Sequence, residues 1–343
     1  MANNLYWPTF AVQTSRGRAA VARRAHNPKV GGSIPSLATS SRSRFLSRAD
    51  FFYTMKAGFV NIFGRPNAGK STLLNAIMGE KMAIVSSKVQ TTRHRIKAFL
   101  NKENEYQIIF SDTPGIIDPK YKLHEKMMGA VKSALEDADV ALLMVDMRDD
   151  IKELDELFAS LKLKVPCVVV LNKSDLAVGT QVKEAVTFFK EKSYCTKIIS
   201  VSALNKSDIE RLLKLVIEMI PEGVPFYSED DLSDLPTKFF VSELIREKIY
   251  QLFGEEIPYH TAVLVNSFKQ QPLLIKIQAD IIVNRETQKA IIIGEKGKMI
   301  KEIGTLARKD IEDFIGSKVY LELFVKVKPK WRDNETKLKE FGY

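Results

Sequence analysis

The sequence has little of what secreted, membrane-spanning or metal-cluster proteins need. Only 2 of its 343 residues are cysteines, Cys167 and Cys195, and their spacing suits neither a disulfide framework nor a metal site. This usage favours a reducing cytoplasm. No run of about 18 apolar residues is present, so no transmembrane helix is predicted and any membrane contact would be peripheral. The hydrophobic fraction of 45% is that of a globular protein, with room for two or three domains.

Acidic side chains are almost absent from the first 54 positions. These positions hold one Asp against eight Lys or Arg and so contribute +7 to the net charge of +10. Residues 276–343 have 15 Lys or Arg against 11 Asp or Glu, which leaves residues 55–275 at −1. The basic excess of the folded part therefore lies at its C-terminal end, where it would attract phosphate groups.

Residues 1–54 are rich in Arg and Ser and show no sustained helix or strand period. Three interpretations stay open: an organellar transit peptide, a disordered basic arm that touches RNA, or a stretch outside the natural protein. The third is favoured, because residues 25–36 resemble the product of translating a tRNA gene and Met55 offers a conventional start before the first predicted strand. We therefore expect residues 1–54 to be a disordered or non-native extension.

A phosphate-binding loop organises the rest of the chain. Residues 64–71, Gly-Arg-Pro-Asn-Ala-Gly-Lys-Ser, form a complete G-x-x-x-x-G-K-[ST] motif between a β-prone apolar stretch (57–63) and a helix-compatible one (72–78). The backbone N–H groups of such a loop and the N-terminus of the next helix bind phosphate. The pattern indicates that Lys70 reaches the β- and γ-phosphates of a nucleotide and that the Ser71 hydroxyl binds Mg²⁺.

Four further motifs follow the loop. Residues 90–94, Gln-Thr-Thr-Arg-His, lie where the first switch of a GTPase would place a threonine on Mg²⁺. Residues 112–115, Asp-Thr-Pro-Gly, end a predicted strand, so the Asp can hold Mg²⁺ through water and the Gly can offer its N–H to the γ-phosphate. Residues 172–175, Asn-Lys-Ser-Asp, match N-K-x-D, whose carboxylate can accept hydrogen bonds from guanine N1–H and N2–H₂. Residues 202–204, Ser-Ala-Leu, match the weakest motif, whose backbone supports the base.

The order and spacing of these motifs carry more weight than any one of them. Apolar stretches at 96–100 and 106–110 predict a β-hairpin, and others between 140 and 171 predict buried strands. The stretches 151–163 and 209–220 are helix-like. Alternating strands and helices give a doubly wound sheet with the ligand loops at the carboxyl ends of the strands, and the hairpin makes the sheet mixed.

A second domain is predicted after an acidic segment. The composition of residues 226–236 predicts an exposed acidic linker, followed by a helix at 239–249 and two strands between 261 and 283. Residues 294–297, Gly-Glu-Lys-Gly, stand between an Ile run and a helical stretch, as in the loop of a KH domain. Two glycines there let the backbone approach a nucleic acid, and a neighbouring apolar groove takes unstacked bases. Residues 319–331 alternate as an antiparallel strand with lysines on one face.

Together these motifs resemble the Era family of bacterial ribosome-assembly GTPases over about residues 57–343. The resemblance implies an α/β Era-type GTPase domain at 55–225 with a doubly wound mixed P-loop sheet, the linker at 226–236, and an α+β KH domain of type II at 237–343. It implies GTP and GDP, Mg²⁺ and, through an Asn at the Asn67 position, K⁺. It also implies binding to the 3′ end of 16S ribosomal RNA, maturation of the 30S subunit, a monomeric state, a cytoplasmic location and peripheral contact with the inner membrane.

The functional residues of the family carry over onto the matching positions of this sequence. The catalytic set would be Lys70, Thr92 and Gly115, and the Mg²⁺ ligands would be Ser71, Thr92 and Asp112. The nucleotide would contact Gly64, Arg65, Pro66, Asn67, Ala68, Gly69, Lys70, Ser71, Thr72, Asp112, Thr113, Pro114, Gly115, Ile116, Asn172, Lys173, Ser174, Asp175, Ser202, Ala203 and Leu204. The RNA would contact Ile293, Gly294, Glu295, Lys296, Gly297, Lys298 and Lys301.

One position departs from the pattern of Ras-like enzymes, which have a water-orienting Gln directly after Asp-x-x-Gly. Here that position is Ile116. Because isoleucine cannot hydrogen-bond water, we expect slow intrinsic GTP hydrolysis that RNA or the ribosome stimulates, with GTP changing the first switch and thereby the presentation of the KH domain to RNA. Two other hypotheses stay open: a non-catalytic RNA-binding protein whose nucleotide domain is structural or sensing, and a GTPase that couples the membrane surface to cell-cycle timing.

Overall fold

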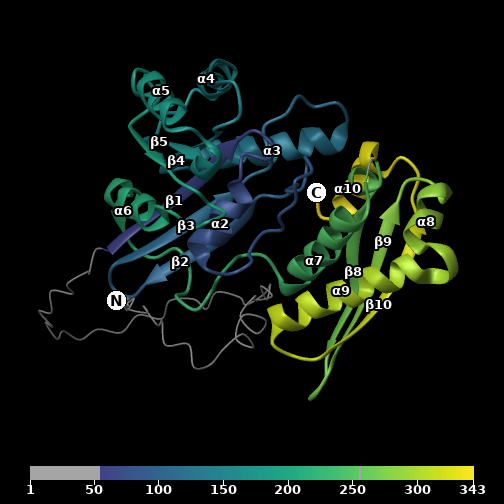
Figure 1. Ribbon diagram of the computed structural model, residues 1–343. Coiled ribbons are helices and arrows are strands. Elements are labelled where there is room, and N and C mark those ends of the chain that lie inside the picture. The colour runs from purple at the N-terminus through teal and green to yellow at the C-terminus, as the bar shows by residue number, and fades with distance from the viewer. Residues whose placement is uncertain (1–54, 255) are drawn as a thin grey trace, which may run out of the picture.

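Two β-sheets organise the chain, as Figure 1 shows. The computed structural model describes residues 55–254 and 256–343, and the interpretations of residues 1–54 lie outside the described residues. The first sheet has the strand order β2-β3-β1-β4-β5-β6, and the short β7 pairs with β1. Its strands are β1 (Met55–Gly64), β2 (Ile96–Lys102), β3 (Tyr106–Asp112), β4 (Val140–Asp146), β5 (Cys167–Asn172), β6 (Lys197–Ser200) and β7 (Glu222–Gly223).

The pairing within this sheet confirms the doubly wound, mixed architecture that the sequence predicts. β2 and β3 form the antiparallel hairpin, β7 is antiparallel to β1, and all other neighbours are parallel. Every residue of β4 and β5 is buried, as expected for strands covered on both faces. One face packs against α2 (Lys70–Met78) and α6 (Ile209–Met219), and the other against α3 (Lys122–Glu136), α4 (Ile151–Ser160) and α5 (Gly179–Lys190).

The second sheet, with the order β10-β9-β8, lies in an α+β domain formed by the C-terminal part of the chain. Apolar side chains of its three longer helices pack against the sheet and form a separate core. The elements are α7 (Thr237–Leu252), β8 (Ala262–Gln270), β9 (Ile275–Val283), α8 (Glu286–Ile293), α9 (Lys298–Ile315), β10 (Val319–Val327) and α10 (Glu335–Glu340).

The antiparallel strand expected at 319–331 is wrong in direction and in length. β10 ends at Val327 and pairs in parallel with β9, from Val319 opposite Ile275 to Val327 opposite Val283. The chain between the two strands forms α8 and α9, and a helical crossover of this kind returns the next strand in the same direction. Alternation of apolar and polar residues predicts a strand, but it contains no information about the direction of the strand beside it.

Residues 226–236 are held against the first domain along its edge strand β2, whereas the sequence predicts an exposed linker. Leu232 O accepts a hydrogen bond from Phe99 N at 2.9 Å. The Tyr227 ring stacks on the Phe99 ring with the centroids 4.0 Å apart. Leu232 and Leu235 pack against the core on that side of the sheet. We call residues 226–236 the docked linker, because its backbone and apolar side chains are fixed although most of its acidic side chains face solvent.

The helix α7 lies between the two domains. Figure 1 places α7 and the C-terminus on the side of the second domain that faces the first. Unlike an ordinary surface helix, α7 buries charged side chains as well as apolar ones, including Glu243, Arg246, Glu247 and Lys248. Among the described residues, no helix is both long and apolar enough to cross a membrane.

Candidate functional site

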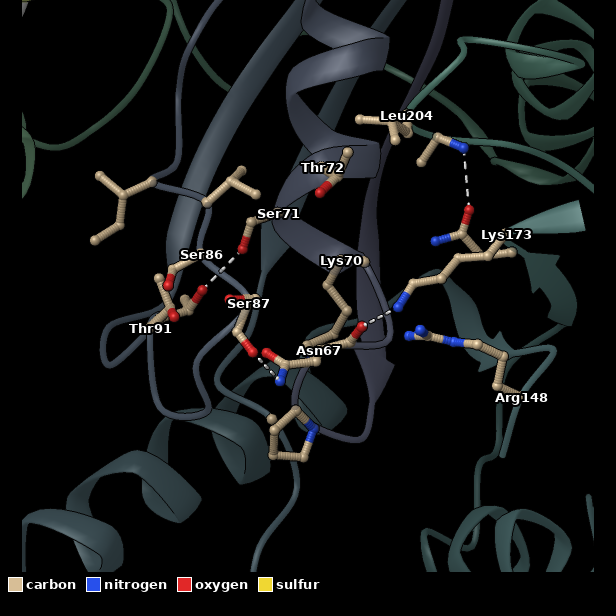
Figure 2. A pocket seen from close by; sticks show the side chains of 18 of the residues that line it. Asn67, Lys70, Ser71, Thr72, Ser86, Ser87, Thr91, Arg148, Lys173 and Leu204 are labelled. Atoms are coloured by element: carbon tan, nitrogen blue, oxygen red, sulfur yellow. Dashed lines mark hydrogen bonds between the residues drawn. The ribbon is translucent and has the colours of Figure 1, made fainter. Parts of the chain in front are cut away.

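The loop between β1 and α2 opens into a cavity of about 500 Å³, the size of a small-ligand pocket. Gly69 stands directly before α2 with a φ of 95°, a conformation that residues with a Cβ rarely adopt. A Cβ on Gly69 would lie 2.2 Å from Asn172 Nδ2, so the close approach of the two loops requires glycine here. In Figure 2, Lys70 lies at the centre of the view, with Ser86 and Ser87 on one side of it and Lys173 and Arg148 on the other.

Lys70 is buried and turned back onto its own loop. Its Nζ donates to Arg65 O at 2.8 Å and to Gly64 O at 3.2 Å. Burial lowers the pKa of Lys70 to about 8, against the opposing effect of the nearby Asp112 carboxylate. An incoming phosphate group would replace these carbonyl contacts with a full negative charge, which favours the ammonium form.

The three residues predicted to bind Mg²⁺ meet behind this loop. Ser71 Oγ donates to Asp112 Oδ2 at 2.6 Å and lies 2.8 Å from Thr92 Oγ1, which itself lies 3.2 Å from Asp112 Oδ2. Burial raises the pKa of Asp112, while Lys70 and the two hydroxyls oppose this rise. Asp112 Oδ1 is buried without a hydrogen-bond partner. Two hydroxyls and a carboxylate with a spare oxygen suit a hard cation that takes its other ligands from water and phosphate.

The Asp-Thr-Pro-Gly loop is tied directly to the phosphate loop. Thr113 Oγ1 donates to Ile62 O at 2.6 Å, and Ile116 N donates to Gly64 O at 3.1 Å. The Ile116 side chain packs against the core formed with α3, α4 and α5. Gly115 lines the cavity, so its backbone can face a ligand, whereas Ile116 does not line it.

Asn172 and Lys173 join the predicted base-binding loop to the phosphate loop. Asn172 Nδ2 donates to Ala68 O at 2.8 Å, and its Oδ1 accepts from Ala203 N at 3.0 Å. Lys173 Nζ donates to Asn67 O at 2.8 Å. Asp175 lines the cavity and is exposed at its mouth, where a carboxylate is accessible to a base.

The structure gathers most of the predicted nucleotide residues around one cavity. The lining includes Pro66, Asn67, Gly69, Lys70, Ser71, Thr72, Thr92, Gly115, Asn172, Lys173, Asp175, Ala203 and Leu204. The others do not line it and lie behind or beside it: Gly64, Arg65, Ala68, Asp112, Thr113, Pro114, Ile116, Ser174 and Ser202.

Two charged residues, one at the end of β4 and one just after it, belong to this site, although no sequence motif marks them. Asp146 is buried and accepts from Lys173 Nζ at 2.5 Å and from Arg148 Nη2 at 2.8 Å. Burial opposes the charged form, yet hydrogen bonds from Arg148 and Lys173 hold the pKa of Asp146 at about 2. Arg148 also lines the cavity. The available signal was an Asp at the carboxyl end of a buried parallel strand, where ligand loops gather.

The predicted RNA-binding residues form one turn between α8 and α9. Gly294 has a φ of 70°, and a Cβ there would lie 2.5 Å from Met299 Cγ. Lys296, Lys298 and Lys301 are exposed in this turn and in the first turn of α9. The backbone of the turn and several positive charges are therefore accessible from solvent, as a nucleic-acid backbone would need.

The switch region between α2 and β2 touches the second domain, which the sequence did not predict. We define the switch segment as residues 81–94. Arg93 lies in the Q-T-T-R-H motif but is 2% exposed, and it is inserted among residues of the second domain. Lys81 Nζ lies 2.5 Å from Glu247 Oε2 and 3.2 Å from Asp310 Oδ2. The second domain thus contacts both ends of the switch segment.

Family models match both parts of the chain. A model described as 50S ribosome-binding GTPase matches residues 59–173, and a KH domain model matches residues 256–332. GTPase Era of Clostridium kluyveri is 43% identical over 292 residues, which are 84% of this chain and 99% of that protein. GTPase Era of Trichlorobacter lovleyi is 46% identical over 292 residues, with 84% and 98% covered.

Two solved structures are similar over the same share of the chain. A variant of Aquifex aeolicus Era bound to GDP·AlF₄⁻ is 41% identical with a TM-score of 0.81, covering 84% of this chain and 99% of its own. Era in complex with MgGDPNP and nucleotides 1506–1542 of 16S ribosomal RNA is 42% identical with a TM-score of 0.80, again covering 84% and 99%. The likeness therefore spans the nucleotide domain and the KH domain together.

Proposed function

Because this chain belongs to the Era family of GTPases, we propose that it binds and hydrolyses GTP in the cavity beside the phosphate loop and binds the 3′ end of 16S ribosomal RNA through its KH domain. The process it serves is then maturation of the 30S subunit. The observation that carries this proposal is the meeting of the Ser71 and Thr92 hydroxyls at Asp112 Oδ2, beside a complete phosphate loop, while the other oxygen of that carboxylate, Oδ1, has no partner.

Each loop has a separate task in this proposal. Residues 64–72 hold the phosphates, and Asn172, Lys173 and Asp175 hold guanine, with Ser174 and residues 202–204 supporting the base. Mg²⁺, when bound by Ser71, Thr92 and Asp112, would offset charge on the phosphate oxygens. Lys70 would add a buried positive charge next to them, and Gly115, which lines the cavity, would offer its N–H to the γ-phosphate.

The packing of Ile116 supports slow hydrolysis by the chain alone. Its side chain is partly buried against the core and has no group that can hold water. Orientation of the attacking water must come from backbone groups or from another molecule. This is why we propose stimulation by RNA or the ribosome.

Potassium is a further part of the proposal. Asn67 Nδ2 donates to Ser87 O at 2.7 Å, so the Asn67 amide lies against the switch segment at the edge of the cavity. Amide and carbonyl oxygens at this edge could share a K⁺ ion with the phosphates. We therefore expect faster turnover in K⁺ than in Na⁺.

Our proposal for the RNA partner rests on the similar structure that contains RNA, because the match extends over nearly all of that protein chain. The family model that mentions the 50S subunit covers residues 59–173 only, whereas the complex with nucleotides 1506–1542 of 16S ribosomal RNA is matched over 99% of its chain. We give more weight to the second, and propose contacts to RNA from residues 293–298 and Lys301. The chain would act on the ribosome as a monomer in the cytoplasm, and liposome flotation would test peripheral contact with the inner membrane.

The test measures GTP hydrolysis by the full chain in K⁺ and in Na⁺, with and without an RNA copying nucleotides 1506–1542. We expect slow turnover that the RNA and K⁺ both raise, and none in a Lys70→Ala variant. Tight RNA binding without turnover in any condition would contradict the enzymatic part and favour a sensing role for the nucleotide domain.

A further inference from the structure

Arg93, the residue directly after Thr92, is anchored in the KH domain and not in its own domain. It is 2% exposed, although it follows a polar loop. Its guanidinium donates to five oxygens of the KH domain: the carbonyls of Thr261 (2.8 Å), Pro258 (3.0 Å) and Tyr259 (3.2 Å) and the phenols of Tyr250 and Tyr343 (3.3 Å each). These contacts come from the two terminal nitrogens, Nη1 and Nη2, whereas Nε has no partner. A planar guanidinium held at both terminal nitrogens has a fixed orientation.

The residues before Thr92 are held by the same domain. Gln90 O accepts from the Tyr250 hydroxyl at 3.0 Å, and Thr91 O accepts from Arg246 Nη2. Tyr250 and Arg246 both lie on α7, and Tyr250 also accepts from Arg93. The chain is therefore held by the KH domain on both sides of Thr92, through backbone carbonyls before it and through the Arg93 side chain after it.

The Thr92 side chain points the other way, into the proposed Mg²⁺ site. Its hydroxyl meets Ser71 Oγ and Asp112 Oδ2 within the nucleotide domain. One short stretch of chain thus contributes a ligand to one domain and its anchors to the other. Any movement of the KH domain relative to the phosphate loop would pull on this stretch.

We propose that Arg93 is the positioning residue through which the docked KH domain holds Thr92 in its Mg²⁺-binding place. This rests on the proposed function, in which Thr92 closes on Mg²⁺ when the γ-phosphate is present. An unanchored switch loop would have to be ordered each time it closes, at a cost in conformational entropy. The docked KH domain orders this loop before GTP binds, so that cost no longer opposes GTP binding. Binding of GTP is therefore favoured over binding of GDP.

Linkage makes the effect reciprocal. If docking of the KH domain raises affinity for GTP, bound GTP must favour the docked domain by the same factor. An RNA that binds more tightly to one position of the KH domain would then change affinity for GTP without touching the nucleotide. Affinity for GDP, which does not use Thr92, would stay nearly constant.

The experiment compares two arginine variants of the full chain. Arg93→Met keeps an unbranched apolar stem and removes every donor to the KH domain. Arg95→Met is the matched control, because Arg95 lies two residues further on and binds Ser111 and Asp137 of the nucleotide domain. For each, the affinities for GDP and for a non-hydrolysable GTP analogue are measured over a Mg²⁺ titration.

We expect Arg93→Met to weaken binding of the GTP analogue about tenfold and to raise the Mg²⁺ concentration it requires, with GDP affinity within about twofold of wild type. Arg95→Met should change the ratio of the two affinities by less than about twofold. An unchanged ratio in Arg93→Met, or an equal change in Arg95→Met, would overturn the inference. Failure of the wild type to bind either nucleotide would instead contradict the proposed function.

Two more variants separate positioning from general stability. Tyr250→Phe removes one hydroxyl that bonds both Gln90 O and Arg93, and it should shift the ratio in the same direction by about threefold. In a Thr92→Ala background, Arg93→Met should have almost no further effect, because Arg93 acts through Thr92. Full additivity of the two changes would show that Arg93 does not act through Thr92.

Discussion

The two glycine turns of this chain both precede a helix and are both expected to meet phosphate, yet they are constructed in opposite ways. The loop at 64–71 lies in a cavity of about 500 Å³ and has a buried lysine. The turn at 294–297 lies on the surface, and the lysines in it and after it are exposed. A single nucleotide can be enclosed on several sides, whereas a long polynucleotide must pass along an open surface. Burial around a glycine turn therefore separates a small-ligand site from a polymer site better than the glycines themselves do.

The largest effect should come from adding one methyl group to the enclosed loop. In Gly69→Ala the new Cβ would lie 2.2 Å from Asn172 Nδ2, at a φ of 95° that alanine rarely adopts. Both loops around the base and phosphates would have to shift, so we expect GTP affinity to fall about 100-fold or more. Titration with a fluorescent GTP analogue measures this, and RNA binding should stay at the wild-type level. GTP affinity within a few-fold of wild type would show that the two loops are not closely fitted.

The open turn should respond less to the same change. In Gly294→Ala the Cβ would lie 2.5 Å from Met299 Cγ, 2.8 Å from its Cβ and 3.0 Å from its backbone N. The start of α9 must therefore shift locally, but this turn lies on the surface, and we expect about a tenfold loss of RNA affinity. Gly297→Ala is the matched control, because its nearest neighbour is 4.0 Å away and only the cost of a φ of 77° remains. Filter binding of the 3′-end RNA would compare the two. A larger loss in Gly297→Ala than in Gly294→Ala would mean that close packing does not define this turn.

Salt dependence should separate the loops further. If Lys296, Lys298 and Lys301 each contact a phosphate of single-stranded RNA, each Lys→Gln change lowers the slope of log K against log salt by about 0.7. RNA titrations between low and moderate salt would measure the slope for each variant. GTP binding by the same variants serves as the control and should be unchanged. A slope equal to that of wild type in all three would remove these lysines from the RNA contact.

A last effect concerns pH and needs no substitution. The pKa of Lys70 is about 8, lowered by burial, and a bound triphosphate favours its charged form. Above pH 8 the free protein must take up a proton to bind, so GTP affinity should fall by roughly tenfold between pH 7.5 and pH 9. Calorimetric or fluorescence titrations across this range would detect it. The residual affinity of Lys70→Ala should lack this dependence, and an equal dependence in that variant would assign it to another group.

Most of the nucleotide cavity could be predicted because its residues come from short local motifs at strand ends. The positions of Lys70, Asn172 and Ala203 follow from the order of parallel strands, and the structure brings them together. Asp146 and Arg148 were missed because a lone Asp at the end of a strand matches no motif. Their role in the site is visible only in the structure, where Lys173 directly after β5 donates to Asp146 at the end of the neighbouring β4.

The contacts between domains could not be predicted from the sequence. Arg93 and Thr261 are 168 positions apart, and Thr91 and Arg246 are 155 apart, so no local period links them. The pattern of α7 also gave no warning, since a helix with charged residues on one side normally turns that side to solvent. Here Arg246 is 1% exposed because the switch segment covers it. The parallel direction of β10 was missed for a similar reason, because the sequence of one strand does not specify which strand pairs with it or in which direction.

The docked linker sets how far the KH domain can travel. The Leu232 carbonyl and the Ser233 hydroxyl are bonded to β2, and α7 begins at Thr237, so little free chain remains between the domains. If the contacts around Arg93 open, the KH domain stays near its docking surface, and redocking is an intramolecular step at an effective concentration of about a millimolar. The polar contacts between the two domains, which would be too weak to hold two separate proteins together, can therefore open and close repeatedly while the domains stay close to each other.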